Sequence, residues 1–255
     1  MNTIEKTFAI LEEIVSHQDT GITFSEIARH HHLPKSTTHR ILKILINLRY
    51  VFFDQNAKKY YGSLKLSKLA SQVIDNFDLR TFIHPHLLKL HEKTKHTCHL
   101  GIINQNVGIY LDKVESRDYG IKLFSEIGKE FPLHCTAMGK VLLAFADPPE
   151  RSSILKGGLH SFTSNTITKR SLLGRELKLV QKNGVAVDRE EITRGIMCIS
   201  APIRNYRGKV LAAISVTFPS YIKDERGLDF EIEAVKDAAV TISSIMGGTA
   251  TKEEA

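Results

Sequence analysis

Cationic, hydroxyl and imidazole side chains are concentrated in one short segment of this 255-residue chain. Between Arg29 and Lys68 stand nine Lys and Arg residues against the single acid Asp54, a net charge of +8 in a chain whose total is +7. Neutralising phosphates releases counterions, so a basic surface of this kind favours a polyanionic partner such as double-stranded DNA. Charge alone also fits a solvated face, and the surrounding elements must decide between the two.

The side chains that suit contact with DNA fall on the polar face of one expected helix. Apolar residues recur at helical spacing after Pro34, at Ile41, Leu42, Leu45 and Leu48. The opposite face therefore carries hydroxyls, an imidazole and cations. The DNA-contacting residues predicted on it are Lys35, Ser36, Thr37, His39, Arg40 and Lys43. Hydroxyl groups bond to phosphates and base edges, and an arginine can bind guanine through two hydrogen bonds.

Two further helices are expected before this basic helix. The first has Thr3 as its predicted N-cap, and its apolar stripe is Ile4, Phe8, Leu11 and Val15. Thr23 and Glu26 have the spacing of a capping box, which opens a short second helix that ends near His30. Pro34 can stand at the first turn of the third helix without losing a needed hydrogen bond.

A basic hairpin is predicted directly after the third helix. Residues 50–53 and 58–61 have the composition of two strands joined by a short turn. Lys58 and Lys59 stand at its tip, where we expect them to meet the DNA backbone or the minor groove. Helices, turn and hairpin in this order predict a winged helix-turn-helix over residues 1–62. The alternative is a small helical domain with a solvated basic face.

The rest of the chain predicts an α+β arrangement of helices around an antiparallel sheet. Residues 63–77 indicate a linker helix, and residues 78–250 a second domain that opens with a long helix running toward Lys95. Strands are expected at residues 98–103, 107–114, 121–126, 184–189, 196–203 and 209–218. Residues 147–169 show too little periodicity to assign an element.

Thr136 is a predicted N-cap of a helix in this second domain. The first turn of a helix offers free N–H groups and the positive end of the helix dipole, which favour an acidic ligand. An ordinary capped helix is the alternative interpretation.

Five strings along the chain share their order and spacing with one protein family. They are LPKSTTHRIL at 33–42, PLHCTAMGKVLLA at 132–144, DREE at 188–191, GIMCISAPI at 195–203 and AAISVT at 212–217. In these strings the chain resembles the IclR-type transcriptional regulators, nearly from end to end. The resemblance implies a winged helix-turn-helix, a linker helix, and a GAF-like effector-binding and oligomerisation domain.

The same resemblance implies a function and its partners. Members of the family are usually homodimers or dimers of dimers that bind near-palindromic operators in double-stranded DNA. Most repress catabolic operons, and their known effectors are commonly small organic acids. The sequence therefore predicts a sequence-specific regulator, more specifically a repressor, whose DNA binding a carboxylate-bearing metabolite controls.

Effector-binding positions follow from the resemblance as well. They are Ala137, Met138, Asp188, Cys198, Ser215 and Thr217. Ser215 and Thr217 are two apart on one strand, so their hydroxyls face the same side and can hold a carboxylate together. Asp188 repels such a ligand unless it accepts a hydroxyl hydrogen, holds water or becomes protonated. Met138 replaces a small residue of some members, which changes the shape of the pocket.

Two other classes of function compete with this prediction. An enzyme would use Cys135 or Cys198 as a thiol nucleophile, with His134 as base and Asp188 as a further residue. Neighbours in sequence such as His134 and Cys135 seldom point together, so we expect no catalytic residues. The other class is a sensor whose N-terminal module no longer reads DNA, against which stand Arg40 and the basic hairpin.

Histidines do not form a metal-binding pattern. The run His30–His32 cannot turn three adjacent imidazoles toward one ion, and we interpret it as the end of a helix. Downstream, His84, His86, His91, His96 and His99 have no carboxylate or thiol set that closes a site. We expect these to be surface or interface histidines, and we expect no metal or cofactor.

Composition favours a cytoplasmic protein. The longest apolar stretches, at residues 141–146 and 210–218, are too short to span a bilayer, and the first residues lack the pattern of a signal peptide. Cys98, Cys135 and Cys198 are an odd number at wide spacings, which fits neither a disulfide framework nor a zinc site.

Overall fold

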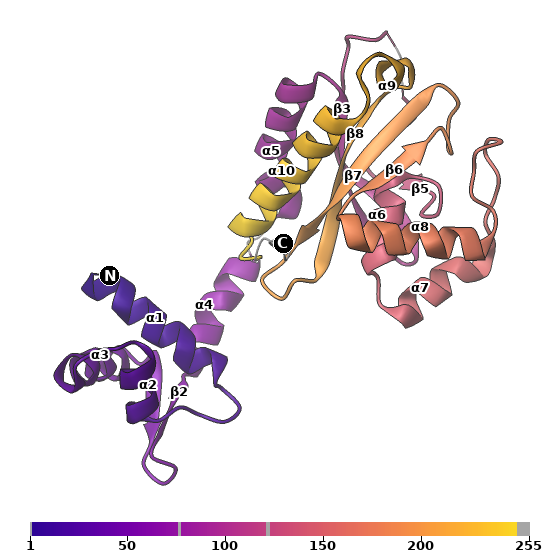
Figure 1. The fold of residues 1–255 in the computed structure, drawn as a ribbon. Coiled ribbons are helices and arrows are strands. Elements are labelled where there is room, and N and C mark those ends of the chain that lie inside the picture. The colour runs from indigo at the N-terminus through magenta and orange to yellow at the C-terminus, as the bar shows by residue number, and fades with distance from the viewer. Residues whose placement is uncertain (1, 76–77, 121–122, 249–255) are drawn as a thin grey trace. The chain divides into compact units, whose positions relative to one another are not determined.

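The computed structural model describes residues 2–75, 78–120 and 123–248 (Figure 1). The chain divides into two compact units, Met1–Phe77 and Asp78–Ala255.

The first unit is a three-helix domain with a hairpin and a following helix. Its elements are α1 (Thr3–Ser16), α2 (Phe24–His30), α3 (Lys35–Asn47), β1 (Val51–Asp54), β2 (Lys59–Gly62) and α4 (Leu64–Asp75). The Thr23–Glu26 capping box that starts α2 is present, and its carboxylate accepts from the Thr23 backbone N–H at 2.8 Å. Residues of α1, α2, α3 and β1 form one buried core, and the hairpin gains a third pairing from a bridge between Ile22 and Tyr60.

The start and the buried face of α1 differ from the sequence-based expectation. Asn2, one residue earlier than Thr3, is the N-cap, because its side chain and that of Glu5 complete a capping box. The core side of α1 carries Ile10 and Ile14, while Ile4 is 69% exposed. Phe8 and Val15 are exposed too, as is Leu48 just beyond the end of α3. A helix with two apolar stripes buries whichever one its neighbours cover.

The second unit is a six-stranded antiparallel sheet with helices on both faces (Figure 1). Its strands, in the spatial order β5-β4-β3-β8-β7-β6, are β5 (Glu130–Phe131), β4 (Val107–Val114), β3 (Thr97–Asn104), β8 (Val210–Pro219), β7 (Ile196–Arg204) and β6 (Ala186–Arg189). Helices α5 (Leu79–Thr94) and α10 (Asp229–Ile245) cover one face, and α6 (Ala137–Phe145) and α8 (Arg170–Asn183) lie over the other. Two short helices, α7 (Pro148–Ile154) and α9 (Tyr221–Arg226), join these elements.

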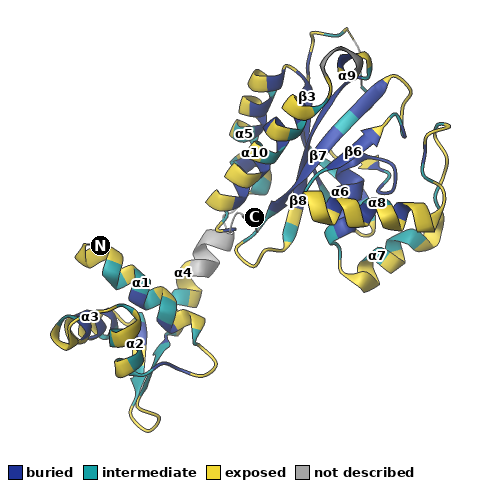
Figure 2. Cartoon of the chain, in the orientation of Figure 1, coloured by how far each residue is buried: buried dark blue, intermediate teal, exposed yellow. Residues whose placement is uncertain are grey.

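Alternation along the central strands divides the apolar residues between two cores. Met197, Ile199, Ala201 and their neighbours on β8 and β3 pack against α5 and α10. Ala186 and Ala213 belong to the other core, which α6 and α8 complete. The strands are dark along most of their length in Figure 2 because both faces of the sheet are covered. The α6 face of the sheet also carries polar side chains, which belong to neither core and are part of the candidate effector site.

Two expectations for this unit are wrong, and one stretch without an expected element contains a helix. Residues 123–126 do not form a strand, and 121–122 lie outside the described residues. The stretch 147–169, to which no element was assigned, contains α7. His96 and His99 are buried rather than on the surface. His96 stacks on Phe218 at 4.6 Å, and His99 bonds to the Ser125 hydroxyl at 2.8 Å, so ring packing and hydrogen bonds offset the cost of burying them.

Candidate DNA-binding face and effector site

The polar face of α3 stands free in the first unit. Of the six α3 residues predicted to contact DNA, all are exposed except Thr37, which is half-buried. Thr38 and Ile41 on the opposite side are buried, and Thr38 donates its hydroxyl to the Pro34 carbonyl at 3.3 Å. The helix has no acidic residue and begins directly after the turn at Pro34. Side chains of this kind on an exposed helix can reach both base edges and phosphates in a major groove.

The two lysines at the hairpin are held differently. Lys58 is exposed at the turn with a left-handed backbone (φ 57°), in a loop ordered by Asp54, whose Oδ1 accepts from the N–H groups of Asn56 and Ala57. Lys59 is half-buried and its ammonium donates to the Thr20 carbonyl at 2.7 Å. An ammonium has three donors, so Lys59 can keep this bond and still meet a phosphate. Lys58 is the freer of the two.

We predict that Lys58→Ala weakens DNA binding without changing sequence preference. Because the lysine would neutralise one phosphate, the slope of log K against log salt should fall in magnitude by about 0.9. Fluorescence anisotropy on one duplex at four salt concentrations measures this slope. Lys178→Ala, an equal change of charge on exposed α8 surface, is the control and should leave it unchanged. An unchanged slope in Lys58→Ala would remove the hairpin tip from the interface.

Strand register brings four of the six predicted effector residues together on the α6 face. Asp188 of β6 is paired with Cys198 of β7, Cys198 with Thr217 of β8, and Thr217 with Thr97 of β3. Asp188, Cys198, Thr217 and Thr97, the last of which was not predicted, therefore form one row across four strands. Ser215 stands two residues from Thr217, in the middle of a second row between Ser200 of β7 and His99 of β3. The Thr217 hydroxyl contacts the Cys198 Sγ at 3.2 Å.

The other two predicted residues, Ala137 and Met138, lie in the first turn of α6 and are buried. Thr136 caps this helix as expected, since its hydroxyl accepts from the Gly139 N–H at 3.1 Å. Position 139 requires glycine, because a Cβ would come 2.3 Å from the Leu133 carbonyl oxygen. Helix α6 contacts β3, β6, β7 and β8, so its start and the polar rows belong to one side of the sheet.

The residues around these rows are tightly packed. A hollow that reaches Thr217 and Thr97 has a volume of about 10 Å³, which is room for about one water molecule. The Met138 Sδ lies 3.1 Å from the position that a Cβ on Gly101 would take. Methionine has three rotatable bonds and adapts its shape readily. The close approach of Met138 to Gly101 leaves little free space between the start of α6 and β3.

Asp188 is fully buried and has one unsatisfied oxygen. Its Oδ1 accepts from the Glu191 N–H at 2.6 Å, while its Oδ2 has no hydrogen-bond partner in the described structure. Burial, reinforced by the negative charge of Glu191, raises the pKa of Asp188 to about 7, although the Glu191 N–H and the Lys140 ammonium oppose this shift. The carboxyl is therefore partly protonated near neutral pH, which reduces its repulsion of an anion.

This shift predicts a pH dependence of stability that Asp188→Asn removes. The folded chain keeps the proton up to about pH 7, while an ordinary Asp loses it near 3.8. Between these values the folded state binds more protons, so this group lowers the free energy of unfolding as pH rises. In urea unfolding at several pH values, the free energy of unfolding of wild type relative to Asp188→Asn should fall as pH rises through that window. Parallel profiles would contradict the shift.

A buried lysine that sequence reasoning missed organises this corner of the unit. Lys140 on α6 is 0% exposed, and its ammonium donates to the Val187 carbonyl at 2.9 Å, to Glu176 on α8 at 3.3 Å, and to Glu191. Glu191 in turn holds Asp188 through its backbone N–H. Both Lys140 and Glu191 occur in the strings that carry the family resemblance. The sequence signal that could have revealed the buried lysine is a single lysine on an otherwise apolar helix face.

The thiols of this region are not activated for nucleophilic chemistry. Burial, strengthened by the charges of Asp188 and Glu191, raises the pKa of Cys135 to about 12, and burial raises that of Cys198 still further. His134 beside Cys135 bonds instead to the His160 carbonyl at 2.9 Å. A thiol needs its thiolate to attack, so the arrangement does not support a cysteine nucleophile.

The described residues contain neither a metal-binding group nor a membrane-spanning helix. Within residues 2–75, 78–120 and 123–248, no group of three or more His, Cys, Asp and Glu side chains is placed to hold a metal ion. In that same part of the chain, none of the helices has the length and apolar character needed to span a membrane.

Comparison with known proteins decides which family this arrangement represents. The family described as bacterial transcriptional regulator IclR C-terminal matches residues 71–244, and the IclR helix-turn-helix domain matches residues 3–55. The chain belongs to the IclR family. The family resemblance seen in the sequence and the predicted α+β fold are thereby confirmed. This IclR-family chain is a DNA-binding transcriptional regulator and not an enzyme, and its C-terminal part is an effector-binding domain.

Named relatives resemble the chain over nearly its whole length. The HTH-type transcriptional regulator KdgR of Escherichia coli (strain K12) is 34% identical over 248 residues, 97% of this chain and 93% of the relative. The HTH-type transcriptional regulator XynR of the same strain is 32% identical, with 97% and 98% covered. The crystal structure of Thermotoga maritima IclR has a TM-score of 0.63 at 33% identity and covers 97% of this chain and 99% of its own.

Proposed function

We propose that this IclR-family protein is a sequence-specific repressor of a catabolic operon, released or retained on its operator by a small carboxylate-bearing metabolite. The observation that supports the proposal is that one chain contains both an exposed basic α3 and a second unit in which α6 lies over the strands with the polar rows. Lys35, Ser36, Thr37, His39, Arg40, Lys43, Lys58 and Lys59 are the proposed DNA contacts.

The proposed effector site is formed by Ala137, Met138, Asp188, Cys198, Ser215 and Thr217. The hydroxyls of Ser215 and Thr217 and the N–H groups at the start of α6 are donors suited to a carboxylate. Asp188, partly protonated at neutral pH, can donate a hydrogen bond or accept one from a ligand hydroxyl. The effector changes DNA binding only if it binds the operator-bound and free conformations with different affinity.

We further propose that the protein acts as a homodimer or a dimer of dimers. The apolar side chains of Ile4, Phe8 and Val15 on α1 are exposed, which favours coverage by a second copy of the chain. Two reading helices in one dimer would match the two halves of a near-palindromic operator. Residues 1–62, 63–77 and 78–250 are the proposed DNA-binding, linker and effector-binding segments.

Selection of bound fragments from the source genome tests the regulator proposal. Full-length protein is mixed with sheared genomic DNA at moderate salt, and the recovered fragments are sequenced. Enrichment of a few near-palindromic sites is expected, and the genes beside them identify carboxylates to assay for release. Diffuse binding that disappears steeply with added salt would show a nonspecific basic surface and contradict the proposal.

The effector site has its own test once a responsive carboxylate is identified. Ser215→Ala combined with Thr217→Ala should weaken the response to that compound, while operator affinity without it stays at the wild-type value. Thr241→Ala with Ser244→Ala removes two exposed hydroxyls from α10 and is the matched control. A normal response in the first double variant would place the effector elsewhere.

A further inference from the structure

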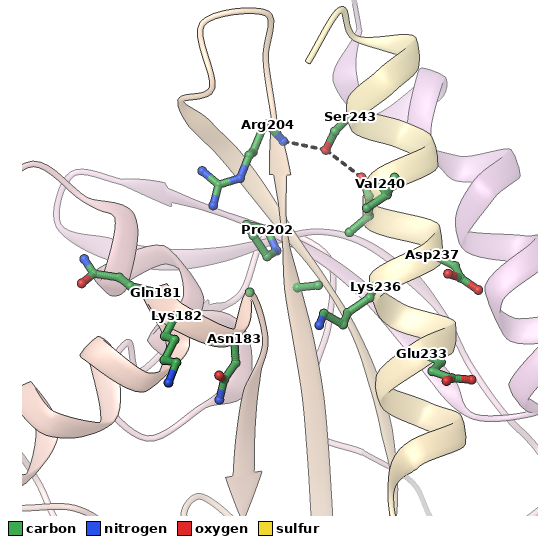
Figure 3. A pocket seen from close by; sticks show the side chains of 13 residues that line it. Gln181, Lys182, Asn183, Pro202, Arg204, Glu233, Lys236, Asp237, Val240 and Ser243 are labelled. Carbon is green, nitrogen blue, oxygen red and sulfur yellow. Dashed lines mark hydrogen bonds between the residues drawn. The ribbon is translucent and has the colours of Figure 1, made fainter. Parts of the chain in front are cut away.

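A hollow of about 560 Å³ lies at the edge of the sheet between α8, β7 and α10 (Figure 3). Strand β6 begins only at Ala186, which pairs with Ser200, so the described structure places no outer strand beside Pro202. Proline has no N–H to give to an added strand, which makes strand addition at this edge unfavourable. The volume falls within the range of small-molecule sites. The hollow shares no lining residue with the proposed effector site.

Three cations from three elements border this hollow. They are Lys182 of α8, Arg204 of β7 and Lys236 of α10, and none has an ion-pair partner among the described residues. Figure 3 shows the Lys236 side chain reaching from α10 toward α8, whereas the carboxylates of Glu233 and Asp237 point the other way. The Lys236 Cε lies 4.0 Å from the position of a Cβ on Gly184, at the end of α8. The charge presented to the hollow is therefore positive.

Arg204 is the most constrained of the three cations. Its guanidinium lies over the Phe145 ring at 4.2 Å and donates to the Gly208 carbonyl at 3.0 Å, while its backbone N–H donates to the Ser243 hydroxyl. The side chain is half-buried, and this burial lowers the pKa of Arg204. A guanidinium has five N–H donors, and one of them is used here. A partly desolvated cation without a carboxylate partner gains free energy when an anion joins it.

We propose that this hollow is a second ligand site, which binds a small molecule carrying at least two negative charges. Arg204 provides an oriented guanidinium, and Lys182 and Lys236 provide ammonium groups from the two helices. The inference does not depend on the effector proposal, because the residues differ. Strand β7 carries both Cys198 and Pro202, so an occupant of the hollow contacts the strand that also crosses the polar rows.

Calorimetric titration of the full-length chain tests this site. Citrate and inorganic phosphate are titrated separately in a low-salt buffer whose other anion is chloride, which distinguishes carboxylate from phosphate chemistry. Saturable binding of one anion per chain is expected for at least one probe. Lys236→Met should weaken it about tenfold, since a charged hydrogen bond is lost. Lys89→Met, a change of the same kind on exposed α5 surface, should bind as wild type.

Three results would overturn the proposal. One is the absence of saturable binding tighter than about 1 mM for both probes. Another is anion binding by Lys236→Met and by a second variant, Lys182→Met, that is as tight as binding by Lys89→Met. Thermal unfolding checks that each variant is folded. The third concerns self-association, measured as the dependence of the sedimentation coefficient on protein concentration. If Lys236→Met altered this dependence relative to wild type, the hollow would be a contact between copies of this chain.

Discussion

Arg40→Ala is expected to bind the selected operator about 5- to 150-fold more weakly than wild type. Arg40 is exposed near the middle of the polar face of α3, and the loss of an arginine that binds a base through two hydrogen bonds costs about 1–3 kcal/mol. The loss should be greatest on the intact site and small on DNA of scrambled sequence, because only base contacts discriminate. Anisotropy titrations with both duplexes measure the ratio.

The control for Arg40 is an arginine in the other unit. Arg175→Ala removes the same charge from an exposed position of α8 and should leave both affinities unchanged. Circular dichroism should show the same helix content for both variants, since Arg40 lies outside the core of its unit. If Arg40→Ala weakened binding to both duplexes equally, the residue would contact phosphate rather than a base.

Lys140→Met is expected to destabilise the second unit by about 3–5 kcal/mol. The methionine fits the volume of the lysine stem, but it leaves Glu191 buried without its cation, and breaking a buried ion pair from one side costs this much. Glu176 loses the same partner but keeps its contact with Arg189 at 3.4 Å. Urea unfolding followed by circular dichroism measures the shift in midpoint.

A double variant separates the ion pair from packing. Lys140→Met with Glu191→Gln removes both charges, so it should be more stable than Lys140→Met alone, and the two substitutions should not add. If Lys140→Met lowered the free energy of unfolding by only about 0.2–1 kcal/mol, as for an exposed ion pair, water would reach the ammonium. The N-terminal unit should unfold at the same urea concentration in every variant.

This buried ion network also explains how the second unit holds its polar rows in place. Lys140 ties α6 to the Val187 carbonyl and to Glu191, and Glu191 positions Asp188. The carbonyl of Glu191 accepts from the buried Thr166 hydroxyl at 2.6 Å, so the long connection before α8 is bonded to the same turn. Movement of α6 when a ligand enters would therefore be transmitted to the turn after β6.

Local sequence patterns determined much of this protein. The capping box at Thr23, the N-cap at Thr136 and the turn at Pro34 depend on neighbours within a few residues, so the sequence predicts them directly. The amphipathic pattern of α3 separates an exposed basic face from a buried one for the same reason. The family strings supplied the fold of the second unit, which local pattern alone leaves open.

Tertiary structure decided everything that depends on which segments meet. Both stripes of α1 are apolar, and only packing shows that Ile10 and Ile14 are buried. His99 entered the interior because Ser125 and Tyr110, distant in sequence, provide a hydroxyl and a ring. Cross-strand register aligned Asp188 with residues far along the chain, and the hollow beside Arg204 exists because β6 is short. Such contacts depend on loop paths and packing, which the order of residues along one segment does not encode.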